Sequence, residues 1–362
     1  MFFRNTVDEA IAAWTRLALA TASHGLPSPL LYHARFLPRD RERAERQLLE
    51  IAGKHAIPAA RKSRLVVATQ AAEQSLDLDF DEMVTDLAPA DSIIQRLGRR
   101  RRHPRQRLGS IDPEGIDRRE ESPVLLHAPS LEEVSAGWFQ RFSRGAAVIY
   151  PDDARLWLGL QHLLDPRTIP GRVDKHSHFS PDTDVRLLLE SVYASPDEVA
   201  TRTPTALHLR HYRDIGNAIA EEDIARRNTL AFEGGLIRDW HTDAPLPDGE
   251  PGATTRLGER YELVLLVEDE GLIRFADDEG DAIESSTCRI PIRLYSDEMD
   301  SGLIQRWVTQ QPLPLQRRLS FCDRLVFRLG EDEGLIARAT DGNGVGRLVT
   351  YSPLVGLTIR RL

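Results

Sequence analysis

Short apolar runs alternate with amphipathic segments along the first third of the chain. Runs at 30–33, 64–68 and 82–87 are apolar and short enough to predict strands, and the segment 39–52 between two of them repeats apolar residues at helical spacing. Alternation of strand and helix is typical of βαβ units, in which helices cover a parallel sheet. The pattern therefore predicts one α/β lobe over residues 1–128, with ligands at the carboxyl ends of its strands.

The pattern changes twice after this lobe. Residues 129–250 are mostly periodic at helical spacing and end in turns that contain Gly and Pro, which predicts a helical linker region. Residues 251–362 alternate polar and apolar positions in short runs separated by turn residues, which predicts strands. We therefore expect an α/β lobe, then a helical region, and then a small β-rich C-terminal domain.

Charge is distributed unevenly along the chain. Residues 1–110 contain 18 Lys and Arg against 13 Asp and Glu, whereas the remaining residues contain 29 against 43, and the net charge is −9. A basic first third suits contact with phosphates. The 2 cysteines are too few for a disulfide framework or a thiolate zinc site, and no apolar stretch is long enough to span a membrane, so we expect a cytoplasmic protein.

Two polar blocks follow consecutive predicted strands. In the first block, the apolar run that ends at Ala68 breaks into Thr69, Gln70, Glu73 and Asp77. Backbone N–H groups and a hydroxyl at such a strand-to-helix turn can bind a phosphate. The carboxylates from Asp77 onward could also suggest a metal site, but no histidine or further acid is spaced to complete one, so we expect none here.

The second block ends a helix predicted over 90–100 and has the sequence Gln95-Arg96-Leu97-Gly98-Arg99-Arg100-Arg101-Arg102. Helical spacing places Gln95, Arg99 and Arg102 on one face. Most arginine runs form a solvated basic face. The glycine within the block and the strand before it favour a defined site instead. Arg105 lies beyond the block, and we expect it in solvent or in nonspecific contact with phosphate.

Together the two blocks resemble motifs V and VI of superfamily 2 helicases. Their residues are most similar in kind to those of the CRISPR-associated helicase-nuclease of type I systems. The resemblance implies that residues 1–128 form the second RecA-like lobe of an ATP-driven motor. It implies that Arg99 and Arg102 are catalytic fingers, which neutralise charge on the γ-phosphate of ATP in the transition state. Asp77 would then lie on the nucleotide side, near the ribose and the fingers.

The same resemblance assigns roles to further residues. Gln95 and Arg96 would help to close the nucleotide cleft. Contacts with a nucleic-acid strand are implied for the first block and for a segment resembling motif IV, and the residues concerned are Thr69, Gln70, Glu73, His33 and Arg35. For His33 a second interpretation stays open, since a lone histidine after a strand is more often a satisfied structural residue.

The sequence contains no phosphate loop of the G-x-x-x-x-G-K-[ST] type and no His-Asp metal-nuclease cluster of the family's kind. The resemblance therefore implies that ATP and its Mg are held mainly by a missing first lobe, and that this chain is a truncated, split or remnant C-terminal part without ATPase activity alone. The expected partners are single-stranded DNA, the first lobe with its metal-nuclease domain, and the CRISPR guide-RNA surveillance complex.

Two other functions stay open at this point. The chain could be a non-catalytic module that binds nucleic acid or docks on a complex, which salt-sensitive DNA binding by the chain alone would favour. It could also be the second lobe of another superfamily 2 helicase, such as a restriction or repair enzyme. The C-terminal β region would distinguish this possibility, because those enzymes have a different C-terminal domain.

Overall fold

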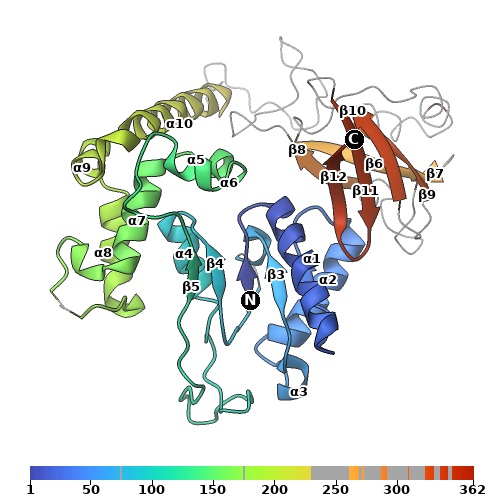
Figure 1. Cartoon of the computed structure of the whole chain (residues 1–362), viewed down its shortest axis with the longest axis horizontal. Coiled ribbons are helices and arrows are strands. Elements are labelled where there is room, and N and C mark those ends of the chain that lie inside the picture. Colours follow the sequence, from blue (N-terminus) through green and yellow to red (C-terminus); the bar gives the residue numbers. More distant parts are fainter. Residues whose placement is uncertain are drawn as a thin grey trace. The chain divides into compact units, whose positions relative to one another are not determined.

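The structure is a computed structural model of the chain (Figure 1), and it describes residues 1–73, 76–173, 176–229, 261–268, 271–272, 287–291, 309, 323–329, 335–340 and 345–362. Contacts divide the chain into two units. Unit 1 combines Met1–Ala128 with Arg260–Leu362, and unit 2 is Pro129–Glu259. The predicted linker after residue 229 lies outside the described residues.

The first part of unit 1 is a five-stranded parallel sheet. Its strands are β1 (Phe2–Phe3), β2 (Leu30–Tyr32), β3 (Val66–Ala68), β4 (Val84–Asp86) and β5 (Leu125–His127). Their order is β2-β3-β1-β4-β5, and every neighbouring pair is parallel. The predicted α/β lobe is therefore confirmed. The central strand β1 is too short to give a periodic signal in the sequence.

Helices cover both faces of this sheet. The helical elements of the lobe are α1 (Val7–Ser23), α2 (Pro38–Ala52), α3 (Pro58–Arg61), the 3₁₀ turn η1 (Gln70–Ala72) and α4 (Ala90–Leu97). Val67 of β3 belongs to the same buried cluster as Ala10 of α1, whereas its neighbour Val66 belongs to the cluster of Leu48 of α2. Because neighbouring side chains of a strand point to opposite faces, α1 and α2 pack on opposite sides of the sheet.

Helix α4 is shorter than the sequence pattern predicts, since it ends at Leu97. Beyond it, the amide of Phe80 donates to the carbonyl of Arg99, and the amide of Arg101 donates to the carbonyl of Phe80, both at 2.8 Å. These bonds form a short parallel bridge and draw the chain out of the helix. The prediction that Arg99 and Arg102 share a helix face is therefore wrong.

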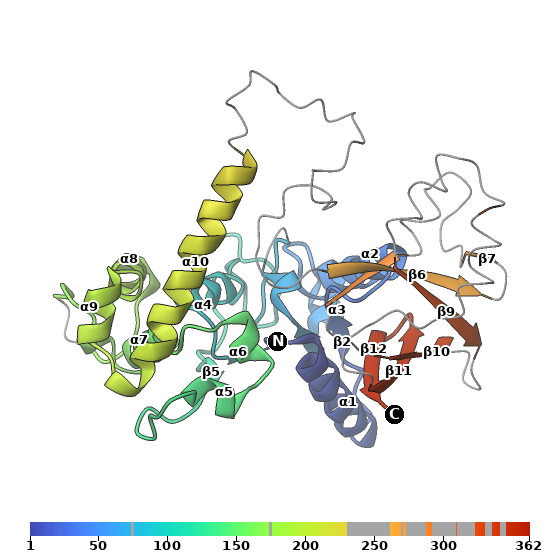
Figure 2. The same cartoon turned by 90° about the horizontal axis from the view of Figure 1, so that it is seen from above.

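Unit 2 is helical, as predicted. Its elements are α5 (Trp138–Phe142), α6 (Ala146–Ile149), α7 (Asp153–Leu164), η2 (Pro166–Thr168), α8 (Pro181–Val192), α9 (Pro196–Thr201), η3 (Thr205–Leu207) and α10 (His208–Thr229). Helix α10 contacts α7 and α9 and continues past them (Figure 2). Within the described ranges, none of the helices combines the length and the apolar character needed to cross a lipid bilayer.

The C-terminal part of unit 1 is a second sheet, which confirms the predicted β-rich region. Its strands are β6 (Tyr261–Glu268), β7 (Gly271–Leu272), β8 (Thr287–Pro291), β9 (Asp323–Leu329), β10 (Leu335–Thr340), β11 (Gly346–Ser352) and β12 (Gly356–Arg361). The order is β12-β11-β10-β9-β6-β7, with β8 beside β6. Strands β6 and β9 are parallel, and the other pairs are antiparallel.

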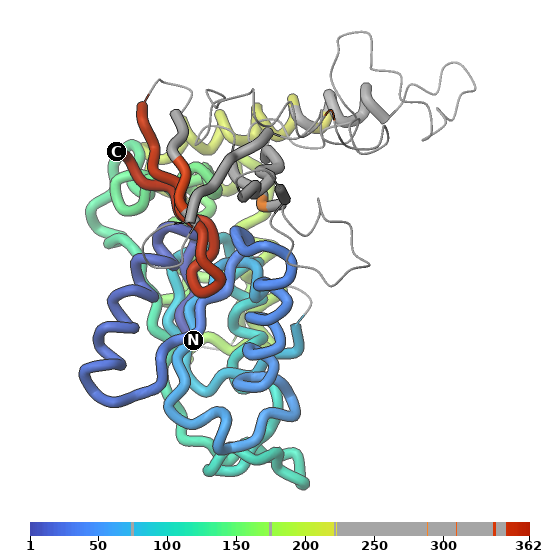
Figure 3. Tube along the Cα trace, turned by 90° about the vertical axis from the view of Figure 1, so that its right-hand side faces the viewer, coloured from blue at the N-terminus to red at the C-terminus, as the bar shows by residue number. Residues whose placement is uncertain are grey.

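The turn between β11 and β12 packs on the α/β lobe within unit 1 (Figure 3). The amide of Leu357 donates to the carbonyl of Arg35 at 2.9 Å, and the hydroxyl of Tyr351 donates to the carboxylate of Asp40. Gly356 has a φ of +74°, and a Cβ there would lie 2.7 Å from the carbonyl oxygen of Arg35. Only glycine fits this contact without a shift of the backbone.

Candidate functional site

A buried arginine joins the carboxyl ends of neighbouring strands. Arg96 of α4 is fully buried, and its Nε donates to Oε1 of Glu73 at 2.7 Å. Its Nη1 donates to the hydroxyl of Thr85 at 2.8 Å and to the carbonyl of Asp86 at 3.0 Å. Its Nη2 donates to Oδ1 of Asn5 at 3.1 Å. We call these residues the Arg96 network. Because protein groups occupy the guanidinium and solvent does not reach it, this geometry gives no support to the predicted contact of Arg96 with nucleotide.

The first polar block supplies the opposite side of the Arg96 network. Thr69 and Glu73 are 3% and 5% exposed, so neither side chain is open to a nucleic-acid strand in this arrangement. The side-chain amide of Gln70 donates to the carbonyl of Asn5 at 3.0 Å. Burial raises the pKa of Glu73, and the neighbouring Arg96 opposes that rise. Strand contact by Thr69, Gln70 and Glu73 stays a prediction, while their contacts within the lobe are direct.

A solvent-accessible cluster lies next to this network. Nε of Arg102 is 2.8 Å from Oδ1 of Asp77, and the two side chains are 42% and 47% exposed. Nε2 of His103 is 2.9 Å from the same oxygen. Arg99 interacts electrostatically with both Arg102 and Asp77. We call Asp77, Arg99, Arg102 and His103 the Asp77 rim. The sequence led us to expect Asp77 near the two arginines, and this is where it lies.

Arg99 connects the Asp77 rim to the Arg96 network. Its Nη2 donates to the backbone carbonyl of Glu73 at 2.8 Å. Burial, followed by repulsion from Arg102, lowers the pKa of Arg99. Its Nε is buried and has no hydrogen-bond partner among the described residues. Two neighbouring guanidiniums that repel one another favour the binding of an anion beside them. Gln95, on α4, is exposed.

The expectation that Arg105 lies in solvent is wrong. Arg105 is fully buried, and its Nε donates to the carboxylate of Asp79. Its Nη2 donates to the carbonyls of Gly53 and Lys54, each at 3.0 Å. Asp79 also accepts from Nη1 of Arg119 at 3.1 Å. Asp79, the buried acid that follows the first block, therefore pairs with Arg105 and Arg119. Within the described ranges, no group of three or more His, Cys, Asp or Glu is placed to hold a metal ion.

The motif IV segment is held by the C-terminal hairpin. His33 is fully buried, its Nε2 lies 2.9 Å from the carbonyl of Val355, and its Nδ1 accepts from the amide of Arg35 at 3.1 Å. Nε2 therefore carries the proton. Burial lowers the pKa of His33 to about 3. Nη1 of Arg35 donates to Oδ1 of Asp8 at 2.6 Å. This favours the structural interpretation of His33, and contact of either residue with nucleic acid stays untested.

Sequence reasoning missed the contributions of Asn5 and His103. Asn5 stands just before α1, where the sequence predicts a helix cap, but Thr6 caps α1 and Asn5 accepts from Arg96. Its place directly after a strand end is the signal that could have identified it. His103 carries no comparable signal, because the turn that holds it is defined by contacts distant in sequence.

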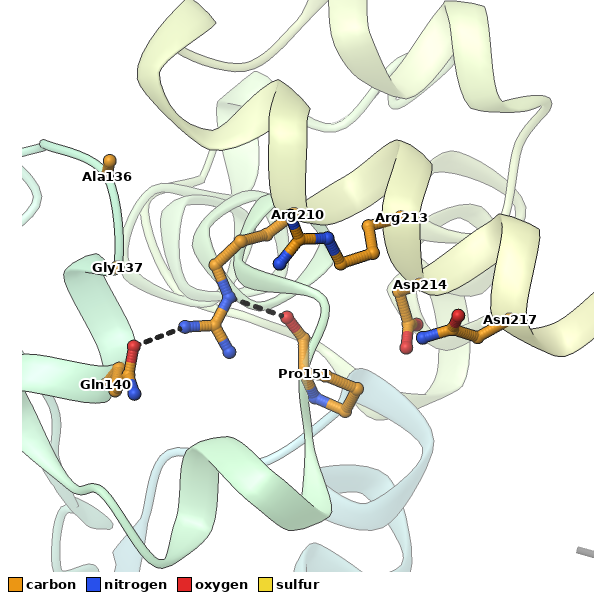
Figure 4. Close-up of a pocket in the computed structure, with 8 residues that line it drawn as sticks. All are labelled: Ala136, Gly137, Gln140, Pro151, Arg210, Arg213, Asp214 and Asn217. Carbon is orange, nitrogen blue, oxygen red and sulfur yellow. Dashed lines mark hydrogen bonds between the residues drawn. The ribbon is translucent and has the colours of Figure 1, made fainter. Parts of the chain in front are cut away.

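Unit 2 contains a separate pocket of about 440 Å³ (Figure 4). Arg210 of α10 crosses it, donating from Nη1 to Oε1 of Gln140 at 3.0 Å and from Nε to the carbonyl of Pro151 at 3.3 Å. The side chain of Arg213 lies above it in the same view. Arg210 thereby ties α10 to α5 and to the segment before α7, which is a structural role.

Comparison with protein families gives a match at the α/β lobe. The model described as "CRISPR-associated nuclease/helicase Cas3, C-terminal" matches residues 1–105. The Cas3 endonuclease/helicase of Thermus thermophilus is 31% identical over 309 residues, which make up 80% of this chain and 29% of that protein. A putative Cas3 of Myxococcus xanthus is 37% identical over 175 residues, 48% of this chain and 20% of the relative. The match thus spans less than a third of either relative's length.

Solved structures share the fold over nearly the whole chain. The crystal structure of T. fusca Cas3-ATP superposes with a TM-score of 0.65 and 21% identity, covering 99% of this chain and 38% of that one. A chain in a pre-nicking CRISPR RNA-guided surveillance complex gives a TM-score of 0.61 at 19% identity, covering 99% and 40%. The fold of unit 1 and unit 2 is therefore shared with a part of each of these chains.

Proposed function

Because the chain corresponds to the C-terminal part of the Cas3 helicase-nuclease, we propose that it supplies the second RecA-like lobe of an ATP-dependent motor that moves on single-stranded DNA in CRISPR defence. In this proposal the phosphate loop and the magnesium ion belong to a first lobe. The present chain contributes the guanidinium groups that complete the nucleotide site.

The observation that carries the proposal is the Asp77 rim. Two guanidiniums, those of Arg99 and Arg102, interact with the one carboxylate of Asp77, and the side chains of Arg102 and Asp77 are accessible to solvent. The partly exposed guanidinium of Arg102 can exchange its carboxylate partner for a phosphate oxygen. The residues present therefore suit the polyphosphate of ATP. The solved T. fusca Cas3 structure named for ATP has the same fold.

The chain's own residues act by electrostatics and positioning. ATP, when bound between two lobes, supplies the phosphoryl group that is transferred to water. Arg99 and Arg102 would stabilise the negative charge that spreads over this group in the transition state. Asp77 holds Arg102 at 2.8 Å, so that its guanidinium is oriented before an anion arrives. The Arg96 network fixes the backbone of Glu73, to which Arg99 is anchored.

The test combines the full chain with a first RecA-like lobe that carries a phosphate loop, supplied as a second chain, and measures ATP hydrolysis with and without single-stranded DNA. Arg99→Ala and Arg102→Ala should each lower turnover by roughly a thousandfold. Arg107→Ala is the matched control, since Arg107 is an exposed arginine in a surface ion pair with Glu120. It should leave turnover unchanged.

Two results would contradict this proposal. One is an assembled sample that binds DNA but hydrolyses ATP no faster than the first lobe alone. The other is an Arg99→Ala variant that keeps the rate of the Arg107→Ala control.

The second candidate is a binding module without turnover, and the basic first third of the chain favours it. In that case the chain alone binds single-stranded DNA, with an affinity that falls steeply as salt rises and does not change with nucleotide or a first lobe. Binding by filter retention over a salt series separates the two candidates.

The proposed partners follow from the relatives. One structural neighbour is a chain in a CRISPR RNA-guided surveillance complex before nicking. We extend this to the present chain as a proposal: it acts beside such a complex, together with a metal-nuclease domain. Co-purification of the full chain with the complex assembled on target DNA, compared with the complex alone, tests it.

A further inference from the structure

The turn that follows α2 lies beside the Asp77 rim. Gly53 pairs with Leu78 in an antiparallel bridge. The next residue along one strand, Lys54, therefore comes opposite the preceding residue of the other, Asp77. Side chains opposite one another across such a pair are close enough to interact. Lys54 is exposed, and no hydrogen bond or ion pair of its side chain is found among the described residues.

This turn is fixed from beneath by a buried guanidinium. Nη2 of Arg105 donates to the carbonyls of Gly53 and Lys54, and its Nη1 donates to the carbonyl of Ala56 at 3.3 Å. Arg105 is itself held by the fully buried carboxylate of Asp79. A buried charge paired in this way costs stability unless its hydrogen bonds are made, so the turn has one strongly preferred conformation. Lys54 is thus presented by a rigid support.

Positive charge exceeds negative charge at this surface. Burial alone would raise the pKa of Asp77, but His103, Arg102 and Lys54 together bring it below its usual range. One carboxylate therefore interacts with three permanent cations, those of Arg99, Arg102 and Lys54. The carboxylate can neutralise only part of that charge. The surplus positive charge favours the binding of a polyanion, since cations gathered on a fixed surface raise the local concentration of their counter-ions.

We propose that Lys54 is a further nucleotide-contacting residue, a third cation for the polyphosphate of a nucleoside triphosphate, which the turn held by Arg105 presents beside Arg99 and Arg102. This inference rests on the function proposed above and adds to it a residue outside the two polar blocks. A lysine on a fixed turn acts here as a point charge, which suits a phosphate oxygen without the planar geometry that a guanidinium requires.

The test uses the full chain assembled with the first lobe and measures kcat and KM for ATP at saturating single-stranded DNA. Lys54→Ala should lower kcat/KM by roughly tenfold or more, the worth of a charge-assisted hydrogen bond. Lys54→Arg should restore most of it. Lys62→Ala is the matched control, because Lys62 is an exposed lysine of the same unit beyond the end of α3. Circular dichroism checks that each variant is folded.

The outcomes separate this inference from the function on which it rests. If Arg99→Ala abolishes turnover while Lys54→Ala behaves like Lys62→Ala, the inference about Lys54 is overturned and the proposed function stands. If Arg99→Ala also keeps full turnover, the proposed function itself fails.

Discussion

The Arg96 network and the Asp77 rim are built from the same run of arginines, yet they have opposite properties. Arg96 is fully buried and donates to Glu73 and Asn5, whereas Arg102 is 42% exposed and faces Asp77. A buried guanidinium whose partners are fixed stabilises the lobe and has no donors to offer a ligand. An exposed guanidinium can exchange a carboxylate for a phosphate at small cost, because an exposed ion pair contributes little.

Residue type and spacing alone therefore do not separate the two roles. Both arginines stand in one motif, and the resemblance assigned both to the nucleotide. Burial separates them, and burial is set by residues far away in sequence. Four tests address how contacts between distant parts of the chain stabilise the lobe.

Removing the buried arginine should have the largest effect. Arg96→Met leaves the carboxylate of Glu73 buried and unpaired, so the free energy of unfolding should fall by about 3–5 kcal/mol. Urea denaturation followed by circular dichroism measures it. Adding Glu73→Leu to the same chain should recover a large part of the loss. Arg46→Met, on the exposed face of α2, is the control and should change stability by under about 0.5 kcal/mol. An equal loss of stability in Arg96→Met and Arg46→Met would show that burial of Arg96 makes no difference.

The contact between the C-terminal hairpin and the lobe comes next. Gly356→Ala places a Cβ 2.7 Å from the carbonyl oxygen of Arg35 at a φ of +74°, and should lower the free energy of unfolding by about 2–3 kcal/mol. Gly25 is the matched control, because its φ is +63° and no atom lies within 4 Å of an added Cβ. Gly25→Ala should cost about 1 kcal/mol. Faster amide exchange at Leu357 should appear in the first variant alone.

Acid should weaken the same contact through His33. Burial lowers the pKa of His33 in the folded chain to about 3, while the unfolded chain binds the proton near its ordinary pKa. The contribution of His33 is therefore fully present above about pH 6.5 and is lost as pH falls toward the folded value. Between about pH 7.5 and 5.0 the free energy of unfolding should fall by roughly 2 kcal/mol more than in His33→Gln. Urea denaturation at both pH values checks this. An equal fall in the free energy of unfolding in the unchanged chain and in His33→Gln would contradict it.

The smallest effect concerns the backbone at Arg101, which lies between Arg99 and Arg102 of the Asp77 rim. Arg101 has a φ of +50°, a conformation that glycine adopts more easily than other residues. Arg101→Gly should therefore raise the free energy of unfolding by up to about 1 kcal/mol. Arg107→Gly, where φ is not positive, should give no gain. Thermal denaturation of the two variants makes the comparison, and a loss in Arg101→Gly would show that its side chain contributes more than the backbone strain costs.

Part of the candidate site could be placed from the sequence, because the resemblance to motifs V and VI implied that the two polar blocks meet. Asp77, Arg99 and Arg102 were expected together, and they are together. The prediction that Arg99 and Arg102 share a helix face was wrong. The backbone carbonyl of Phe80 accepts from the amide of Arg101, and α4 ends early. A helix-period argument considers only local neighbours, and this competitor comes from the other polar block.

The sequence alone predicted the alternation of strands and helices along the lobe and the two polar blocks that carry the candidate residues, since alternation of apolar runs is a local property. Only the tertiary structure decided which arginines are buried. Asn5 reaches Arg96, the turn at Gly53 and Lys54 covers Arg105, and Val355 closes over His33. Each partner comes from a distant part of the chain, and the cost of burying a charge depends on whether such a partner is there to receive its hydrogen bonds.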